Sequence, residues 1–292
     1  MRKGTDLITL DTLIELGACD EGLEFFAEHH PDGGEYQKVL DTACEHDQPD
    51  FASWLLNRLG PTDDVLAVDE IKTDGAVVFA GKIVVERWIE AGGLIKSGKS
   101  IEAGEWINAG GSIKADEWIK ADWSIEAGGL IEAGGSIEAG WLINAGGSIK
   151  AAGLIRADGS IKAGRLIKAG GSIKAAGSIE AGGLIEAGGS IKADEWIKAG
   201  WSIEAGEWIK AGRSIEAGWL INAGGLIKAG GSIEANGSIK AGGLIEAGYG
   251  FGIYAGLKVK LYDKSNRTVT AKIKPDNLMC GEFVPLEDSH EN

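Results

Sequence analysis

The sequence predicts a mainly β fold: a β-solenoid of about 32 hexapeptide repeats, with a small N-terminal α-helical module and a C-terminal β-hairpin cap. An apolar residue recurs every six positions from Ile71 to Leu257, and it is isoleucine at every step from Ile89 to Ile245. Two residues after each isoleucine comes a small residue, nearly always alanine, and then usually glycine. Because a glycine in every six residues would repeatedly destabilise a helix, the hexads must be strands and turns.

The alternation within the unit Ser-Ile-Glu-Ala assigns its side chains to faces. The charged residue after isoleucine must be solvated, so isoleucine and alanine point inward. The residue before isoleucine then points outward, on the same side as the charge. Stacked coils therefore bury a column of isoleucine and a column of alanine.

The number of hexads in one coil has two solutions. Three hexads give an 18-residue, three-sided coil, as in proteins of the left-handed hexapeptide-repeat type, and two give a 12-residue, two-sided ribbon. The outward residue alternates between Ser and Leu or Trp with a period of twelve. A two-sided coil would stack like on like, whereas a three-sided coil would alternate the two kinds up each face. We favour the three-sided coil. To match the left-handed type, Ala must stand at the position of the aliphatic residue and Ile at the position of the small residue. The handedness of the coil therefore stays open.

Three or four short helices are expected between residues 5 and 60. Asp11 and Asp20 are candidate N-caps of the first two helices, and Gly17 ends the first. Gly60 closes the fourth. About sixty residues make only a small core, so this bundle is expected to lean on the solenoid.

The chain ends in alternating sequence that predicts a β-hairpin, with strands at 258–262 and 268–273 around a turn at 263–266. Both ends of a solenoid need a cover, because a bare coil presents an unpaired strand edge. We therefore divide the chain into an acidic α-helical module at 1–62, the hexapeptide-repeat solenoid at 63–257 and a C-terminal cap at 258–292.

Charge is unevenly distributed along the chain, whose net charge is −15. Residues 1–80 carry 18 acidic and 5 basic side chains, whereas residues 81–247 carry 20 acidic and 18 basic ones. The acidity thus belongs to the N-terminal module. A hexad region close to neutral cannot imitate the charge of DNA, and direct nucleic-acid binding is not expected.

Enzymatic activity is not expected, and neither is a catalytic residue, a metal or a cofactor. Hexad solenoids that act as acyltransferases or carbonic anhydrases depend on histidine in or beside the coils. Here no histidine lies between Asp47 and Ser289, and the hexads contain no cysteine. A zinc site in the helical module is a minor alternative, although its candidate ligands match no finger spacing: Cys19, His29, His30, Cys44 and His46.

The cellular setting is expected to be the cytoplasm. Three scattered cysteines fit a reducing compartment, the N-terminus lacks the apolar segment of a signal peptide, and no run of 18 apolar residues could span a membrane.

Outward-pointing Leu and Trp residues form the first candidate site. Exposed apolar ladders of this length are unusual on a monomer and are typical of an interface, most simply that of a homodimer. Packing under the helical module or along neighbouring ladders is the alternative. The candidate interface residues are Trp88, Leu94, Trp106, Trp118, Leu130, Leu142, Leu154, Leu166, Leu184, Trp196, Trp208 and Leu220, together with Trp123, Trp141, Trp201 and Trp219 one place earlier in the hexad.

Acidic residues of the helical module form the second candidate site, which would face a protein partner with a basic surface. They are Asp20, Glu21, Glu24, Glu28, Asp32, Glu35, Asp41, Glu45, Asp47 and Asp50.

The hexads resemble those of uncharacterised Ser-Ile-Glu-Ala-Gly-Gly repeat proteins of bacteria and phages. Leu16-Gly-Ala-Cys-Asp-Glu-Gly22 and Ala52-Ser-Trp-Leu-Leu56 are similar to a helical module found ahead of such repeats. The resemblance implies a small non-enzymatic protein, and phage membership would favour an inhibitor of host defence acting in the host cytoplasm. Bactofilin-type filament proteins share the β-helical form.

We therefore expect a non-enzymatic binding protein that occludes a host defence or nucleic-acid-processing complex. A self-assembling, bactofilin-like scaffold is the alternative. A hexapeptide-type acyltransferase comes third, because the coils lack histidine.

Overall fold

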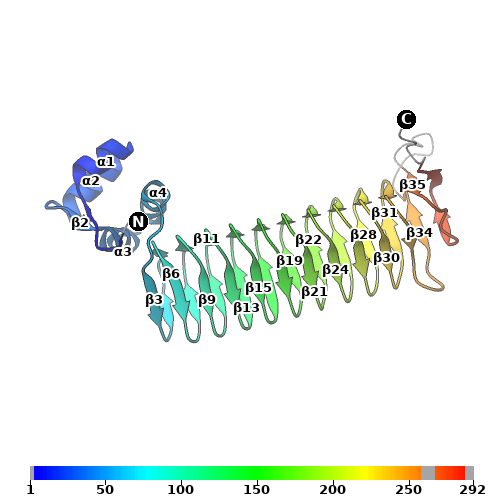
Figure 1. The fold of residues 1–292 in the computed structure, drawn as a ribbon, viewed down its shortest axis with the longest axis horizontal. Helices are drawn as coiled ribbons and strands as arrows, with labels where there is room; N and C mark the ends of the chain where they lie inside the picture. The colour runs from blue at the N-terminus through cyan, green and yellow to red at the C-terminus, as the bar shows by residue number, and fades with distance from the viewer. Residues whose placement is uncertain (1–2, 258–266, 287–292) are drawn as a thin grey trace. The chain divides into compact units, whose positions relative to one another are not determined.

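The computed structural model describes residues 3–257 and 267–286. The chain is divided into two compact units, residues 1–136 and 137–292. The predicted fold class is confirmed: the protein is mainly β, a parallel β-solenoid of about 12 turns built from three sheets, with four short N-terminal helices (Figure 1).

Four helices are present in the first unit, where three or four were predicted. They are α1 (Leu10–Leu16), α2 (Asp20–His29), α3 (Tyr36–Glu45) and α4 (Pro49–Leu59), with a two-stranded antiparallel pair formed by β1 (Leu7–Ile8) and β2 (Gly34–Glu35).

The helix ends differ in detail from the prediction. Thr9, not Asp11, caps α1, because the Thr9 hydroxyl accepts the backbone N–H of Thr12 at 3.3 Å and the chain turns helical two residues earlier than expected. Asp20 is the first residue of α2 and not its cap. Gly17 ends α1 as predicted, with φ of 78°.

The helical module packs on the first coils, as its small size predicted. Tyr36, Leu40 and Leu55 are fully buried in one core that also contains Val78 and Ala80 of the solenoid. The segment that leads from α4 to the first strand is fixed, since Thr62 is buried and its N–H donates to the Ala80 carbonyl at 2.9 Å. Helices and first coils therefore share a hydrophobic core.

Polar contacts reinforce this junction. The Gln37 side chain donates to the Val78 carbonyl and accepts the Ala80 N–H, both at 2.9 Å. The Lys96 ammonium donates to Asn57 Oδ1 at 2.6 Å, and burial lowers the pKa of this lysine.

Three faces make up the solenoid, and we number them by their first strands, β3, β4 and β5. In the first unit, face 1 holds β3 (Val65–Val68), β6 (Lys82–Val85), β9 (Ile101–Ala103) and β12 (Ile119–Ala121); face 2 holds β4 (Ile71–Thr73), β7 (Ile89–Ala91), β10 (Ile107–Ala109) and β13 (Ser124–Ala127); face 3 holds β5 (Val77–Phe79), β8 (Ile95–Ser97), β11 (Ile113–Ala115) and β14 (Ile131–Ala133).

The second unit repeats this order. Face 1 holds β15 (Ile137–Ala139), β18 (Ile155–Ala157), β21 (Ile173–Ala175), β24 (Ile191–Ala193), β27 (Ile209–Ala211), β30 (Ile227–Ala229) and β33 (Ile245–Glu246). Face 2 holds β16 (Leu142–Ala145), β19 (Ile161–Ala163), β22 (Ile179–Ala181), β25 (Ile197–Ala199), β28 (Ile215–Ala217), β31 (Ile233–Ala235), β34 (Ile253–Ala255) and β36 (Leu278–Cys280). Face 3 holds β17 (Ile149–Ala151), β20 (Ile167–Ala169), β23 (Ile185–Ala187), β26 (Ile203–Ala205), β29 (Ile221–Ala223), β32 (Ile239–Ala241), β35 (Thr268–Ala271) and β37 (Glu282–Pro285).

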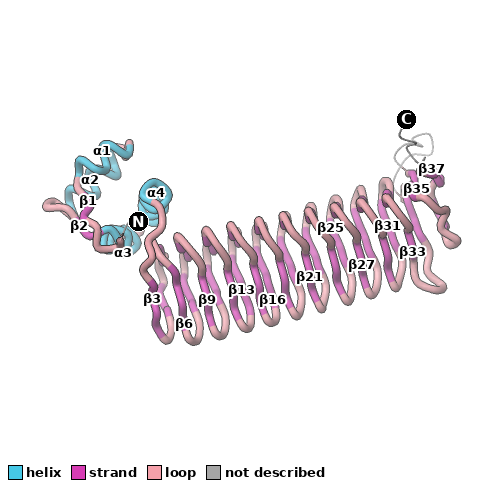
Figure 2. The backbone as a smooth tube through the Cα atoms, in the orientation of Figure 1, coloured by secondary structure: helices cyan, strands magenta, loops and turns pink. Residues whose placement is uncertain are grey.

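Register settles the size of the coil. Within each unit, the solenoid strands up to β35 pair in parallel with the strand three places along the chain, so that Ile107 lies beside Ile125 in the first unit and Ile185 beside Ile203 in the second. These partners are separated by three hexads, which confirms the three-sided coil and rules out the two-sided ribbon. Short strands alternate with turns throughout (Figure 2).

The predicted inward columns are confirmed. The isoleucines from Ile89 to Ile239 are fully buried, and the alanines that follow them are at most 8% exposed. The glycine after alanine allows close stacking: a Cβ on Gly188 would lie under 3.0 Å from the Gly170 carbonyl of the coil before. This close approach explains why glycine is usual at that turn.

The repeat departs from the six-residue period near its C-terminal end. Phe251 and Leu257, predicted to continue the inward column, are 51% and 47% exposed. Ile253 is fully buried instead and lies beside Ile233, so this coil is two residues longer than three hexads. The extra length is taken up in a turn in which Gly250 has a φ of 81°. The prediction for Phe251 and Leu257 was therefore wrong.

The predicted terminal hairpin is corrected in part. Its first strand and turn, at 258–266, lie outside the described residues. Its second strand corresponds to β35, which has parallel neighbours on both edges, β32 and β37. Val269 and Ala271 are fully buried in the slots of isoleucine and alanine. This strand thus extends face 3 of the solenoid instead of pairing in a hairpin.

Candidate interaction surfaces

The sixteen predicted interface residues all lie on or beside the outer surface of the coils, but they are unequally covered. Six are exposed: Trp118, Trp123, Trp141, Trp196, Trp201 and Trp219. Ten are half-buried: Trp88, Leu94, Trp106, Leu130, Leu142, Leu154, Leu166, Leu184, Trp208 and Leu220.

Neighbouring side chains cover part of this surface. Trp88 and Trp106, in consecutive coils of face 2, stack with ring centroids 5.7 Å apart and Lys72 over the Trp88 ring. Lys82 lies over Trp118, whose indole N–H donates to Glu102 at 2.7 Å. These three rings therefore contact side chains of neighbouring coils on their own face, which agrees with packing along neighbouring ladders and not with an interface.

Leu94 is used within the molecule. It packs against the core of the helical module, together with residues of α4 such as Phe51 and Trp54. This residue therefore belongs to the junction between helices and coils.

Three of the four tryptophans two places before isoleucine are the most open. Trp123, Trp141 and Trp201 are 65%, 67% and 63% exposed. Trp201 and Trp219 lie in the turns before β26 and β29, which are consecutive strands of face 3. The Trp219 backbone N–H donates to the Trp201 carbonyl at 2.6 Å. Four large rings at turn positions remain as exposed apolar surface.

The acidic candidates occupy the surface of the helical module as expected. All ten are exposed: Asp20, Glu21, Glu24, Glu28, Asp32, Glu35, Asp41, Glu45, Asp47 and Asp50. Removal of water from its carboxylate raises the pKa of Asp41, although a hydrogen bond from Gln37 opposes this effect.

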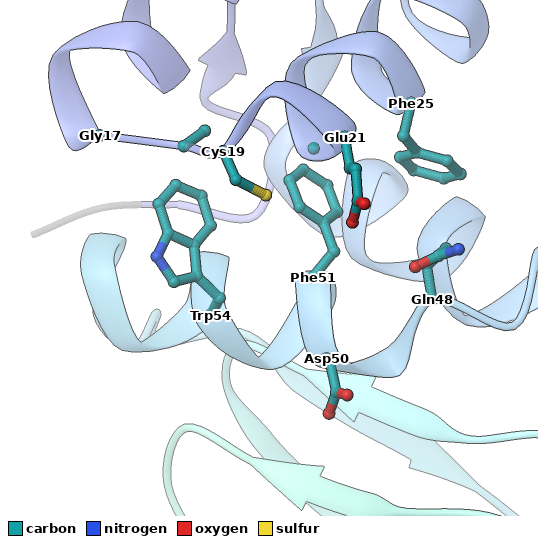
Figure 3. Close-up of a pocket in the computed structure, with 10 residues that line it drawn as sticks. Gly17, Cys19, Glu21, Phe25, Gln48, Asp50, Phe51 and Trp54 are labelled. Carbon is teal, nitrogen blue, oxygen red and sulfur yellow. The ribbon is translucent and has the colours of Figure 1, made fainter.

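A hollow between α2 and α4, which sequence patterns did not reveal, lies beside part of this acidic surface (Figure 3). Its volume is about 590 Å³. Three aromatic side chains form its apolar wall: Phe51 meets the Phe25 ring edge-on at 5.5 Å and stacks with Trp54 at 6.0 Å. Glu21 and Asp50 line the same hollow.

Local sequence explains how the hollow forms. Gly22 faces the Phe51 ring, where a Cβ would come within 3.1 Å of two ring carbons. The absence of a side chain at Gly22 lets the aromatic ring approach the backbone of α2. The signal in the sequence is therefore a glycine inside a helix, which costs helix stability and usually has a packing reason.

The five candidate zinc ligands do not converge. His29 and His46 have ring centroids 4.2 Å apart, and the His29 ring nitrogen Nδ1 lies 2.9 Å from the Phe25 carbonyl. Cys19 is exposed, whereas burial raises the pKa of Cys44 to about 11. Within residues 3–257 and 267–286, no three potential ligands of the His, Cys, Asp and Glu types are grouped.

The fold and these surfaces define a class of protein: a β-solenoid repeat protein carrying a small helical module. Residues 1–59 match a family model described as the YdhT N-terminal domain. No curated protein and no solved structure matches the chain significantly. In the part of the chain that the structure describes, no helix combines the length and apolar composition needed to cross a membrane.

Proposed function

We propose that this protein is a non-enzymatic binding protein of the cytoplasm, whose helical module docks a basic segment of a partner protein. Occlusion of a host defence or nucleic-acid-processing complex by a phage-encoded inhibitor is the activity we favour. A nucleic-acid channel is basic, so it offers the charge that the acidic module complements.

The hollow between α2 and α4 carries this proposal. Its aromatic wall suits an apolar side chain, and Glu21 and Asp50 beside it suit Lys or Arg neighbours of that side chain. Acidic side chains continue around the module, so a basic partner would be attracted before it docks. The occupant is thus a segment with an aromatic or large aliphatic residue next to basic ones.

A displayed library of random peptides tests the proposal without requiring that the partner be identified first. Peptides selected by the full-length protein should combine a large apolar residue with Lys or Arg. Their binding should weaken with added salt and fall by about tenfold or more in a variant with Glu21→Lys and Asp50→Lys, since two close charge pairs are reversed.

A variant with Asp32→Lys and Glu35→Lys is the matched control. It makes the same change in net charge at exposed positions that do not line the hollow. Equal losses in the two variants, or selected peptides without basic residues, would show that the hollow is not the docking site.

A second function is favoured by the exposed tryptophans: self-association into a homodimer, or a bactofilin-like scaffold. Replacement of Trp201 and Trp219 by Ser should then shift light scattering from dimer to monomer, with little dependence on salt because the contact is apolar. Filaments in electron micrographs would favour the scaffold, and a sharp dimer peak would exclude it.

A further inference from the structure

Five consecutive strands of face 1 carry a cation at the same outward position. In β18, β21, β24, β27 and β30, the residue after isoleucine is Arg156, Lys174, Lys192, Lys210 and Lys228, respectively. Adjacent members are register partners in the parallel sheet, from Arg156 beside Lys174 to Lys210 beside Lys228. We call this column the basic ladder. Like charges on facing strands repel, so the ladder is unfavourable for folding alone.

On the other two faces of the same unit, acidic residues interrupt the cations at this position, so no row of five cations forms. On face 2, Lys162 lies 4.0 Å from Glu180 of the next coil, and Lys198 lies 3.1 Å from Glu216. Face 3 has a similar pair between consecutive coils. Among the described members of the basic ladder, only Lys228 pairs with the coil that follows it, through Glu246 at 2.7 Å.

Within their own strands and turns, two members of the ladder are partly neutralised. Arg156 meets Asp158 at 3.1 Å and Lys192 meets Asp194 at 3.2 Å. Lys174 and Lys210 are exposed, and neither forms an ion pair among the described residues. The ladder therefore holds cationic side chains that can bind acidic groups of a partner.

A groove of about 400 Å³ runs beside the ladder. Lys174 and Lys192 form part of its lining, and Leu154 and Trp208 provide apolar surface. One acid, Glu207, also lines it and accepts a hydrogen bond from Ser190 at 2.5 Å. The groove thus suits a narrow element that is acidic along one side.

The acidic module of the same chain contains such an element. Asp20, Glu24 and Glu28 recur every four residues on α2, so they share one face and are about 6 Å apart along the helix axis. All three are exposed, and none of them lines the hollow between α2 and α4. The cations of the ladder repeat about every 4.8 Å, and long lysine side chains can absorb the difference.

We propose that the basic ladder and its groove dock the Asp20–Glu24–Glu28 face of α2 from a second copy of this chain. Charge complementarity favours this occupant: residues 1–80, with 5 basic and 18 acidic side chains, carry a net charge of −13, whereas the ladder joins five cations within one sheet. The contact uses neither the hollow nor the exposed tryptophans, but Asp20, Glu24 and Glu28 belong to the same acidic surface that attracts the basic partner proposed above.

Sedimentation velocity of the full-length protein over a range of concentrations and salt tests the contact. Association should rise with concentration and weaken with salt. Lys174→Glu with Lys210→Glu should weaken it by about tenfold, since each exposed ion pair contributes a factor of a few and both are reversed. Glu24→Lys with Glu28→Lys should weaken it similarly. Mixing the two variants should restore association, because each then offers a charge opposite to that of the other.

The matched control is Lys162→Glu with Lys198→Glu, the same charge change on face 2, which should leave association at the wild-type level. Circular dichroism establishes that each variant folds. The proposal would be overturned if the protein did not associate, or if its association did not depend on concentration. It would also be overturned if the control weakened association as much as the ladder variant does, or if mixing the two variants did not restore association. A further contradicting result would be a labelled oligothymidylate that binds the wild type but not the ladder variant, while the two proteins self-associate equally.

Discussion

Substitution of Ile185 by Ala tests the argument that a column of isoleucine holds the coils together. Ile185 is fully buried in β23, between Ile167 and Ile203 of the adjacent coils. The change removes three buried carbons, worth about 0.8 kcal/mol each, or about 2.4 kcal/mol in transfer free energy. A residual cavity adds to this loss, because coils fixed by backbone hydrogen bonds can collapse only partly. We expect a total of about 3 to 4 kcal/mol.

Urea unfolding followed by tryptophan fluorescence measures this loss, since nine of the ten tryptophans lie in the solenoid. Glu186→Ala is the control at the neighbouring position. It removes only an exposed ion pair with Lys168, at 2.8 Å, and should cost at most about 1 kcal/mol. If Ile185→Ala cost no more than Glu186→Ala, the inward column would not be the main source of stability.

Three further predictions concern the helical module and its junction. Gly17→Ala should lower the free energy of unfolding by about 1 kcal/mol in chemical denaturation, because φ is 78° and a Cβ there meets nothing within 4 Å, so the cost is backbone strain alone. Cys19 should react with a thiol reagent near neutral pH much faster than Cys44, whose raised pKa of about 11 keeps it protonated. Equal reaction rates of the two cysteines would contradict this difference. The contribution of the protonated Cys44 thiol to the free energy of unfolding should be fully present below pH 9.0 and be lost as pH rises towards 11. Lys96→Met should change the thermal stability by about 1 kcal/mol or less in either direction, because burial of the ammonium offsets its hydrogen bonds, whereas Lys96→Glu should be clearly destabilising.

The isoleucine period was sufficient to predict the solenoid because one inward residue per hexad must be buried in every coil. It did not by itself decide between the two-sided and the three-sided coil. Both coils bury the same columns, and they differ only in which outward residues become neighbours. The stacked pair Trp88 and Trp106 shows the outcome: these residues are three hexads apart and interact through the three-sided register.

Prediction failed where local chemistry competed with the repeat. The Thr9 cap was missed because a second threonine, Thr12, completes a reciprocal cap, whereas Asp11 offered a simpler candidate. At the other end, Phe251 kept the spacing of the hexad, but the turn at Gly250 shifted the buried position to Ile253. Apolar spacing alone does not record an inserted turn.

The candidate surfaces depended on tertiary structure to different degrees. The acidic surface could be predicted because charged residues on short amphipathic helices are solvated. The hollow could not, because Phe51 and Gly22 meet only after α2 and α4 pack together. The basic ladder is visible in the sequence as the charged residue of every third hexad from Arg156 to Lys228, but only once the coil length is known.

The coil length also restricts how a chain of this kind can change its length. Gain or loss of three hexads leaves every later side chain on its original face, so columns such as the basic ladder are lengthened or shortened but not scrambled. Gain or loss of a single hexad keeps isoleucine and alanine inside, yet moves every later residue to the next face. Folding would tolerate that event, while any binding surface spread over several coils would be cut in two. Duplication in steps of one whole coil is therefore the route by which such a surface can be inherited intact.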